Sequence, residues 1–116
     1  RTMIRLGVPV ALGTDFNPSC WVENQQLTVA LSCRQMKMTI CEAITAATIN
    51  SAHAINRASK VGSLEPNKKA DVAILDVSNH KVLGYRFGTN LVDKVVKEGR
   101  LVVSDGRRLK RYSPQR

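Results

Sequence analysis

An acidic residue follows an apolar run near the start of the chain. Residues 8–12 read Val-Pro-Val-Ala-Leu, Asp15 comes three positions later, and Asn17-Pro18 stands close behind. A carboxylate at the end of a buried strand is costly unless a metal ion, an opposite charge or several hydrogen-bond donors compensate it. Asp15 is therefore the first candidate for a functional residue, and contact with a metal ion is one chemistry that suits its position.

Other residue types that bind metals are few. Cys20, Cys33 and Cys41 are odd in number, and their spacing matches neither a disulfide framework nor a C-x-x-C metal site. We expect them to be reduced thiols, as in a cytoplasmic protein. His53 and His80 have no second histidine at metal-binding spacing, so we expect both to be structural or exposed.

Length and composition indicate a globular chain. It has 116 residues, of which 43% are hydrophobic, and no apolar run approaches the roughly 20 residues that span a bilayer. The first residues lack the apolar stretch of a signal peptide. Because the sequence opens without Met, in what reads as the tail of a helix, we expect a piece of a longer cytoplasmic protein with no membrane segment.

Positive charge is concentrated in the second half of the chain. The net charge is +9. Residues 1–58 carry five Lys and Arg against three Asp and Glu, and residues 59–116 carry thirteen against six. One Trp, two Tyr and two Phe leave few rings to stack on bases, so we expect a solvated basic face rather than a nucleic-acid site. The positive charges bunch only in a tail at Arg107, Arg108, Lys110, Arg111 and Arg116.

The first elements alternate as in an α/β protein. Residues 1–7 read as the end of a helix that Gly7 closes. Residues 8–14 have the apolar, Val-rich character of a strand buried on both faces, as in a parallel sheet. A loop over 15–21 leads to a helical pattern over 23–37.

The next helix has a well-defined start. Thr39 and Glu42 form a capping box, in which each side chain accepts the backbone N–H of the other residue. We expect this helix to end near residue 48. Asn50 is then expected to cap a second short helix over 50–55.

The pattern changes near Ser59 to antiparallel β-structure. Turn residues occur at Pro66-Asn67, Glu98-Gly99 and Asp105-Gly106. The segments between them predict strands over 61–65, 70–77, 91–97 and 100–103.

Several motifs in these segments resemble the amidohydrolase superfamily, and most closely its imidazolonepropionase family. The narrowest match is Ala-Leu-Gly-Thr-Asp-Phe-Asn-Pro over residues 11–18. The resemblance implies that residues 1–58 are the last strand and helices of a (β/α)8 TIM barrel. It also implies that residues 59–116 are the C-terminal part of a small composite β-sandwich. Weaker matches lie at 38–43, 46–50, 62–65, 69–71 and 85–90.

The resemblance also implies a reaction. Imidazolonepropionases hydrolyse a cyclic amide C–N bond, converting 4-imidazolone-5-propanoate to N-formimidoyl-L-glutamate in histidine degradation. A zinc or iron ion supplies their hydroxide, and Asp15 matches the aspartate that contacts the metal and moves the proton. Asn17 matches a substrate-binding position. Ser19 and Cys20 stand where the family has Gly and then Ser or Thr, so a backbone contact at Ser19 survives while Cys20 offers only a weaker thiol.

Two alternatives to this function stay open. One is another amidohydrolase acting on a cyclic amide or amidine, and the other is a small basic module that binds an acidic partner. The family's metal-binding histidines have no match in this chain, so we expect the 116 residues to be inactive by themselves. We also expect the chain to self-associate through unpaired strands, or to exist as part of a larger homo-oligomeric enzyme with a small-molecule substrate.

Overall fold

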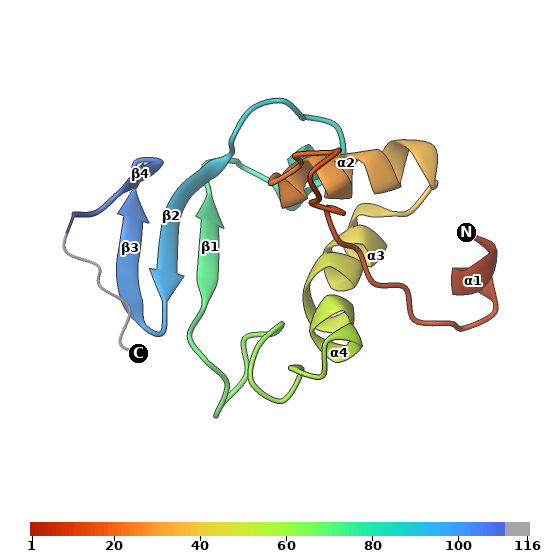
Figure 1. The fold of residues 1–116 in the computed structure, drawn as a ribbon, viewed down its shortest axis with the longest axis horizontal. Helices are drawn as coiled ribbons and strands as arrows, with labels where there is room; N and C mark the ends of the chain where they lie inside the picture. The colour runs from red at the N-terminus through yellow and green to blue at the C-terminus, as the bar shows by residue number, and fades with distance from the viewer. Residues whose placement is uncertain (111–116) are drawn as a thin grey trace.

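A helical layer stands beside a four-stranded sheet in the computed structural model, which describes residues 1–110 (Figure 1). A short helix, α1 (Thr2–Arg5), lies at the N-terminal end, away from the sheet. None of the helices within residues 1–110 is long and apolar enough to cross a membrane. The helical layer contains α2 (Gln25–Gln35), α3 (Ile40–Thr45), η1 (Ala46–Asn50) and α4 (Ser51–Ala54).

The capping box predicted from the sequence is confirmed. Thr39 Oγ1 accepts the N–H of Glu42 at 3.3 Å, and Glu42 Oε2 accepts the N–H of Thr39 at 2.7 Å. Asn24 caps α2 in a similar way, because its side chain accepts the N–H groups of Gln26 and Leu27. These caps fix where the two helices begin, and their buried faces meet in a core of Val29, Met38, Ala43 and Ala46.

The prediction of two separate helices after Thr39 is wrong. The segments α3, η1 and α4 follow one another without a break, and η1 is a π-helical turn. Asn50 is itself helical, with φ −68° and ψ −40°, and caps nothing. Its side-chain amide donates to the carbonyl oxygen of Val10 at 2.9 Å. The role of Asn50 thus depends on a residue distant in sequence, and capping rules consider only neighbouring residues.

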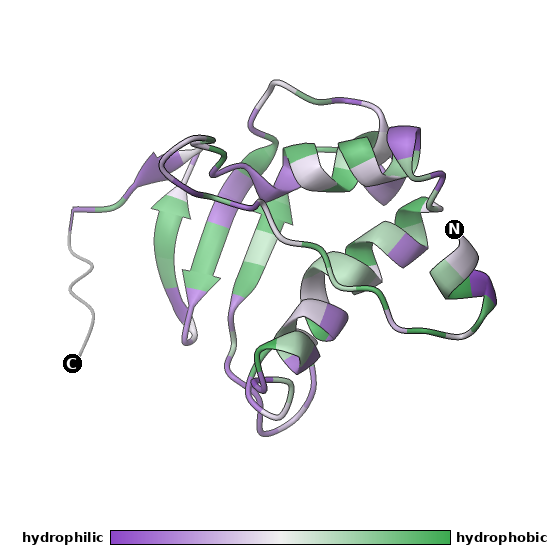
Figure 2. Cartoon of the chain, turned by 45° about the vertical axis from the view of Figure 1, so that its right-hand side comes forward, coloured by the Kyte–Doolittle hydropathy of each residue, from purple (hydrophilic) through white to green (hydrophobic). Residues whose placement is uncertain are grey.

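The sheet is antiparallel throughout, in the order β1-β2-β3-β4. Its two hairpin turns lie at the predicted dipeptides, with φ of +50° and +77° at Glu98-Gly99 and +52° and +68° at Asp105-Gly106. Positive φ at both central residues is typical of a type I′ turn, whose twist matches that of paired strands. Apolar residues follow the strands in Figure 2. The strands are β1 (Val72–Leu75), β2 (Val92–Lys97), β3 (Arg100–Ser104) and β4 (Arg107–Arg108).

Two predicted strands are absent from the described residues. Residues 61–63 form bends and residues 64–65 have no regular structure. Residues 8–14 also run without regular structure, with Val8 46% exposed. A strand buried on two faces needs a strand on each side, and no strand lies beside 8–14 within residues 1–110. In the predicted basic tail, Arg107 and Arg108 form β4, whereas Arg111 and Arg116 lie outside the described residues.

The helical layer and the sheet are joined at two places. Near one end, Gln26 accepts the N–H of Leu91 at 3.0 Å and donates to Asn90 Oδ1 at 3.0 Å. Near the other, Gly62 approaches α4 so closely that a Cβ would come within 2.7 Å of Ala52 Cβ, and its φ of +98° also favours glycine.

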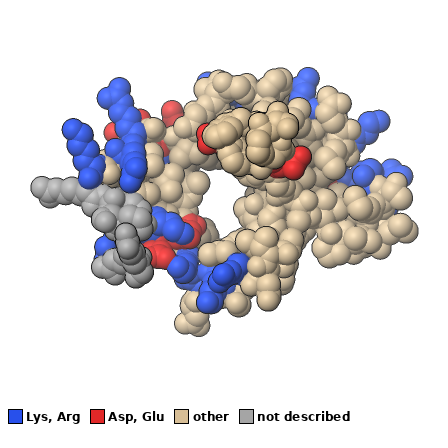
Figure 3. Space-filling model, viewed as in Figure 1, with Lys and Arg blue, Asp and Glu red and all other residues tan. Residues whose placement is uncertain are grey.

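A hollow separates the two layers between these joints and is visible as an opening in Figure 3. Two cavities, of about 490 and 730 Å³, lie in it, and both are lined by Ile44, Ala47, Thr48 and Ala73. A 3-10 helix, η2 (His80–Gly84), connects β1 back to the helical layer, where it packs against α2 and α3. Arg34 of α2 lies 5.4 Å from the ring centre of Phe87 in the loop that follows.

Candidate functional site

Asp15 lies on the surface, just after the extended segment. Its carboxylate has no hydrogen-bond or ion-pair partner within residues 1–110. Its backbone has a φ of +55°, a left-handed conformation that Asp tolerates better than most residues. The carboxylate is therefore open to solvent and free to contact a ligand.

The segment before Asp15 is held by the long helix instead of by neighbouring strands. The N–H of Leu12 donates to the carbonyl oxygen of Ala46 at 3.0 Å and lies 3.2 Å from Ser51 Oγ. Ser51 Oγ is in turn 2.7 Å from the carbonyl oxygens of both Leu12 and Ala46, which share its single proton. Together with the bond from Asn50 to Val10, these contacts position the backbone that leads to Asp15.

Asn17 organises a tight turn. Its Oδ1 accepts the N–H groups of Ser19 and Cys20, both at 3.0 Å, and its Nδ2 donates to the carbonyl oxygen of Asp15 at 2.5 Å. The backbones of Asn17 and Cys20 also pair as an isolated bridge, with two N–H···O contacts of 3.1 Å. One amide hydrogen of Asn17 remains for a ligand, while the Ser19 N–H that the sequence offered for a backbone contact is occupied.

Exposed aromatic rings and a free thiol border this turn. Phe16 and Trp21 are 50% and 73% exposed, and they meet edge to face with ring centres 4.8 Å apart. Cys20 lies between them in sequence, exposed and unpaired. Asp15, Asn17, Ser19 and Cys20 therefore lie in one exposed loop, as their sequence proximity requires.

The described residues do not form a metal site by themselves. Within residues 1–110, no group of three or more His, Cys, Asp or Glu side chains could hold a metal ion. Zinc takes three or four protein ligands, and Asp15 offers one. His53 and His80 are both exposed. A metal ion at Asp15 would need ligands from outside the described residues.

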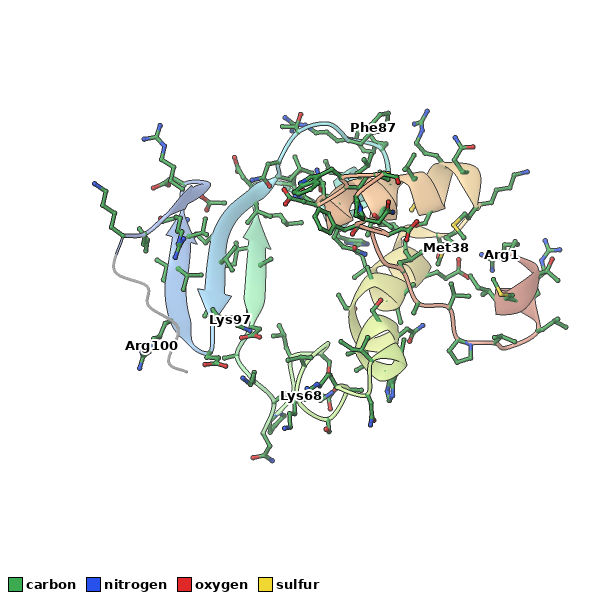
Figure 4. The ribbon with its side chains drawn as sticks, in the orientation of Figure 1. Arg1, Met38, Lys68, Phe87, Lys97 and Arg100 are labelled. Atoms are coloured by element: carbon green, nitrogen blue, oxygen red, sulfur yellow. The ribbon has the colours of Figure 1, made fainter. Side chains whose placement is uncertain are left out.

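The segment 62–71, which carried part of the family resemblance, has structural contacts in this chain. Asp71 accepts the N–H of Glu98 at 2.8 Å and forms an ion pair with Lys97 at the β2–β3 turn. The hydrogen bond from the Lys97 side chain, and after it the N–H of Glu98, lower the pKa of Asp71. Figure 4 shows Lys97 at the turn end of β2 and Lys68 in the loop before β1. This segment thus anchors the hairpin to the loop from the helical layer.

Arg1 and Glu42 link the N-terminal helix to α3. Two contacts, of 2.5 and 2.7 Å, join the guanidinium of Arg1 to both carboxylate oxygens of Glu42. The Arg1 guanidinium, together with the N–H of Thr39, lowers the pKa of Glu42 to about 2. Glu42 therefore serves both the capping box and the attachment of α1.

Ser51, Asn50 and Glu42 are thus positioning residues whose long-range contacts the sequence analysis missed. The signal that could have found Ser51 is weak. A Ser inside a helix often bonds a nearby backbone carbonyl, but nothing in the sequence indicates that the carbonyl of Leu12 lies beside it.

Known proteins of similar sequence are enzymes about four times longer than this chain. A model of the amidohydrolase family matches residues 1–102. The chain is 53% identical over 108 residues to the imidazolonepropionase of Alkaliphilus metalliredigens (strain QYMF), which covers 92% of this chain and 26% of that protein. It is 51% identical to the imidazolonepropionase of Geobacillus kaustophilus (strain HTA426), with the same coverage. The chain spans about a quarter of the length of these curated relatives.

Solved structures agree on the fold. A zinc-bound adenosine deaminase from Xanthomonas campestris superposes with a TM-score of 0.72, covering 93% of this chain and 28% of that chain at 21% identity. At that identity the likeness concerns the fold alone. The similarity to imidazolonepropionases that the motifs predicted is confirmed, and so is the mixed α/β class.

Proposed function

Because the chain belongs to the amidohydrolase family, we propose that it is part of a metal-dependent hydrolase that opens the ring of 4-imidazolone-5-propanoate to give N-formimidoyl-L-glutamate. The observation that carries this proposal is the 53% identity to an imidazolonepropionase over 92% of the chain. In the longer protein, residues 1–58 would complete the barrel and residues 59–116 would form part of the β-sandwich.

Asp15 is the group that moves the proton. Its carboxylate takes a proton from the attacking water and returns it to the ring nitrogen that leaves. Its exposure and lack of a partner within residues 1–110 support this role. In the same proposal Asp15 is one ligand of a zinc or iron ion, and the remaining ligands come from outside this chain.

Asn17 and Cys20 contact the substrate in this proposal. Asn17 has one amide hydrogen left after its bond to the carbonyl oxygen of Asp15. The thiol of Cys20 is exposed. A thiol donates a weaker hydrogen bond than a hydroxyl, and this difference supports a second candidate, in which the substrate is another cyclic amide or amidine.

A hybrid enzyme tests the proposal. The aligned 108 residues of this chain would replace their counterpart in the Alkaliphilus metalliredigens imidazolonepropionase. Loss of 4-imidazolone-5-propanoate and release of formimidoylglutamate are then measured. We expect turnover by the hybrid. A folded hybrid with the parent's metal content that leaves this substrate intact would overturn the proposal, and turnover of a different cyclic amide or amidine would favour the second candidate.

A further inference from the structure

A cysteine and a histidine meet on the surface formed by α3 and η2. Cys41 Sγ and His80 Nε2 are 4.0 Å apart, at the outer limit of a hydrogen bond that involves sulfur. Both residues are exposed. One stands in the first turn of α3 and the other begins η2, so two elements distant in sequence create the pair.

The other two thiols have different surroundings. Cys20 is exposed like Cys41 but has no histidine beside it within residues 1–110. Cys33 is half-buried, close to the turn at Gly84, and burial raises the pKa of its thiol. The chain therefore contains one exposed thiol with an imidazole neighbour, one exposed thiol without, and one that solvent reaches poorly.

We propose that Cys41 and His80 form a thiol–imidazole pair that makes Cys41 the preferred site of covalent modification by small-molecule disulfides and other soft electrophiles. A nucleophile with a base in hydrogen-bond reach is the arrangement that activates thiols in proteins, and the thiolate is the form that reacts. Neither residue of the pair has a role in the proposed hydrolase activity, so the inference is independent of that activity.

The reaction with a disulfide is balanced as follows. The proton of the Cys41 thiol passes to His80 Nε2, and the thiolate sulfur attacks one sulfur of the small disulfide. A new S–S bond forms to Cys41 while the original S–S bond breaks. The other half leaves as a thiolate and takes the proton from the imidazolium. Cys41 is oxidised, the small disulfide is reduced, and His80 returns to its neutral form.

Charged residues near the pair define the controls. Lys81 follows His80 on η2, Glu42 follows Cys41 on α3 and is paired with Arg1, and Arg34 and Lys37 lie at the end of α2 and just after it. Lys81 is exposed and directly follows the histidine in sequence. Replacing it tests whether positive charge on η2, rather than the imidazole, determines the reactivity of Cys41.

The experiment measures the alkylation rate of each cysteine by iodoacetamide, a neutral probe, using mass spectrometry of the 116-residue chain. We expect Cys41 to react about tenfold faster than Cys20, because the neighbouring imidazole can accept the thiol proton as the sulfur attacks. Cys33 should react most slowly. His80→Gln should reduce the Cys41 rate to that of Cys20, whereas Lys81→Gln should leave it within about twofold. Slow alkylation of Cys33 in every variant would show that the fold is intact.

A second measurement completes the test. With oxidised glutathione, the mixed disulfide should form first at Cys41 and should be absent there in Cys41→Ser. Equal rates at Cys41 and Cys20, or a Cys41 rate that His80→Gln does not change, would overturn the proposal.

Discussion

Residues 8–14 and residues 91–108 both carry strand-like sequence, yet only the second region forms strands. The second region pairs with itself through two turns, at Glu98-Gly99 and Asp105-Gly106. The first reaches instead to the helix over 40–54 for its hydrogen bonds. Each strand of a hairpin finds its partner strand a few residues away, whereas a strand of a parallel sheet depends on partner strands distant in sequence.

The difference separates stability from function in this chain. The hairpin region is ordered by local turns and by the contacts of Asp71. The segment 8–22 has few buried side chains and carries every predicted site residue. Regions with few buried contacts open most easily, so changes in 8–22 should alter activity or local order, and changes in 91–108 should alter global stability.

The largest expected effect comes from Asp15→Asn in the hybrid enzyme. We expect the variant to lower kcat by about 10²-fold or more, because the amide cannot move the proton. Global stability should change little, since Asn also tolerates a positive φ. Steady-state kinetics and denaturant unfolding measure the two quantities.

Asp105→Asn is the matched control for that variant. Asp105 is also exposed and has a φ of +52°, close to the +55° of Asp15, but it lies in the β3–β4 turn. The kcat of the Asp105→Asn hybrid should equal that of the unmodified hybrid. Comparable losses in the two variants would show that the effect of Asp15→Asn comes from turn geometry and not from proton transfer.

Ser51→Ala tests the attachment of the segment 8–12. The hydroxyl of Ser51 contacts the backbone of Leu12 on both sides, so we expect a loss of about 1–2 kcal/mol in the free energy of unfolding. Amide exchange at Leu12 should accelerate. Ser104→Ala is the control in the hairpin. Within residues 1–110 that hydroxyl contacts only the adjacent Asp105, so its loss should cost less than about 0.5 kcal/mol. A larger loss in Ser104→Ala than in Ser51→Ala would show that the Ser51 hydroxyl does not hold the segment 8–12.

Gly99→Ala and Gly7→Ala introduce the same backbone strain in the hairpin and just before the segment 8–22. Both glycines have a positive φ, +77° and +74°, and open space where a Cβ would stand. Alanine in this conformation costs about 1 kcal/mol. We expect Gly99→Ala to lower the free energy of unfolding by that amount, because the turn is part of the cooperative sheet. Gly7→Ala should accelerate exchange only in residues 2–12. Equal shifts in the denaturation midpoint would contradict this distinction.

The smallest expected effect is the detachment of α1 from α3 at acidic pH. The pKa of Glu42 in the folded chain is about 2, below its usual 4.5. The stabilisation by Arg1 is therefore present above about pH 4.5 and is lost as the pH falls toward 2. The protection of α1 amides from exchange, relative to an unfolded peptide at the same pH, should fall over that window. In Glu42→Gln the protection should be low at every pH. Unchanged protection in the unmodified chain down to about pH 2 would exclude the pair as the attachment.

Local signals were sufficient for much of the fold. The capping box at Thr39 and the two type I′ turns depend on residues three or fewer positions apart, and a sequence pattern contains all of that information. The role of Asn50 and the unpaired state of residues 8–14 depend on contacts about 40 positions away. No local pattern contains those contacts.

The sequence predicted the loop that carries the candidate site residues, but not the contacts within that loop. The motif over residues 11–18 located Asp15 and Asn17 in one loop. It did not reveal that the amide oxygen of Asn17 is already occupied by two backbone N–H groups. Nor did it indicate the pair of Cys41 and His80, since those residues are 39 positions apart and meet only because η2 returns to the helical layer.

The π-turn of η1 (Ala46–Asn50) also determines the phase of the long helix. An α-helix advances about 100° per residue, so residues five apart point in clearly different directions. The wider turn brings Ala46 and Ser51 close enough for a contact of 2.7 Å. Ala43 before the turn and Ala46 at its start face the core with Met38, and after the turn Ala52 faces Gly62. If residues 46–50 wound as a regular α-helix with no residue removed, α4 would be rotated by about 100° relative to α3, so that Ser51 would lose Leu12 and Ala52 would lose Gly62 together.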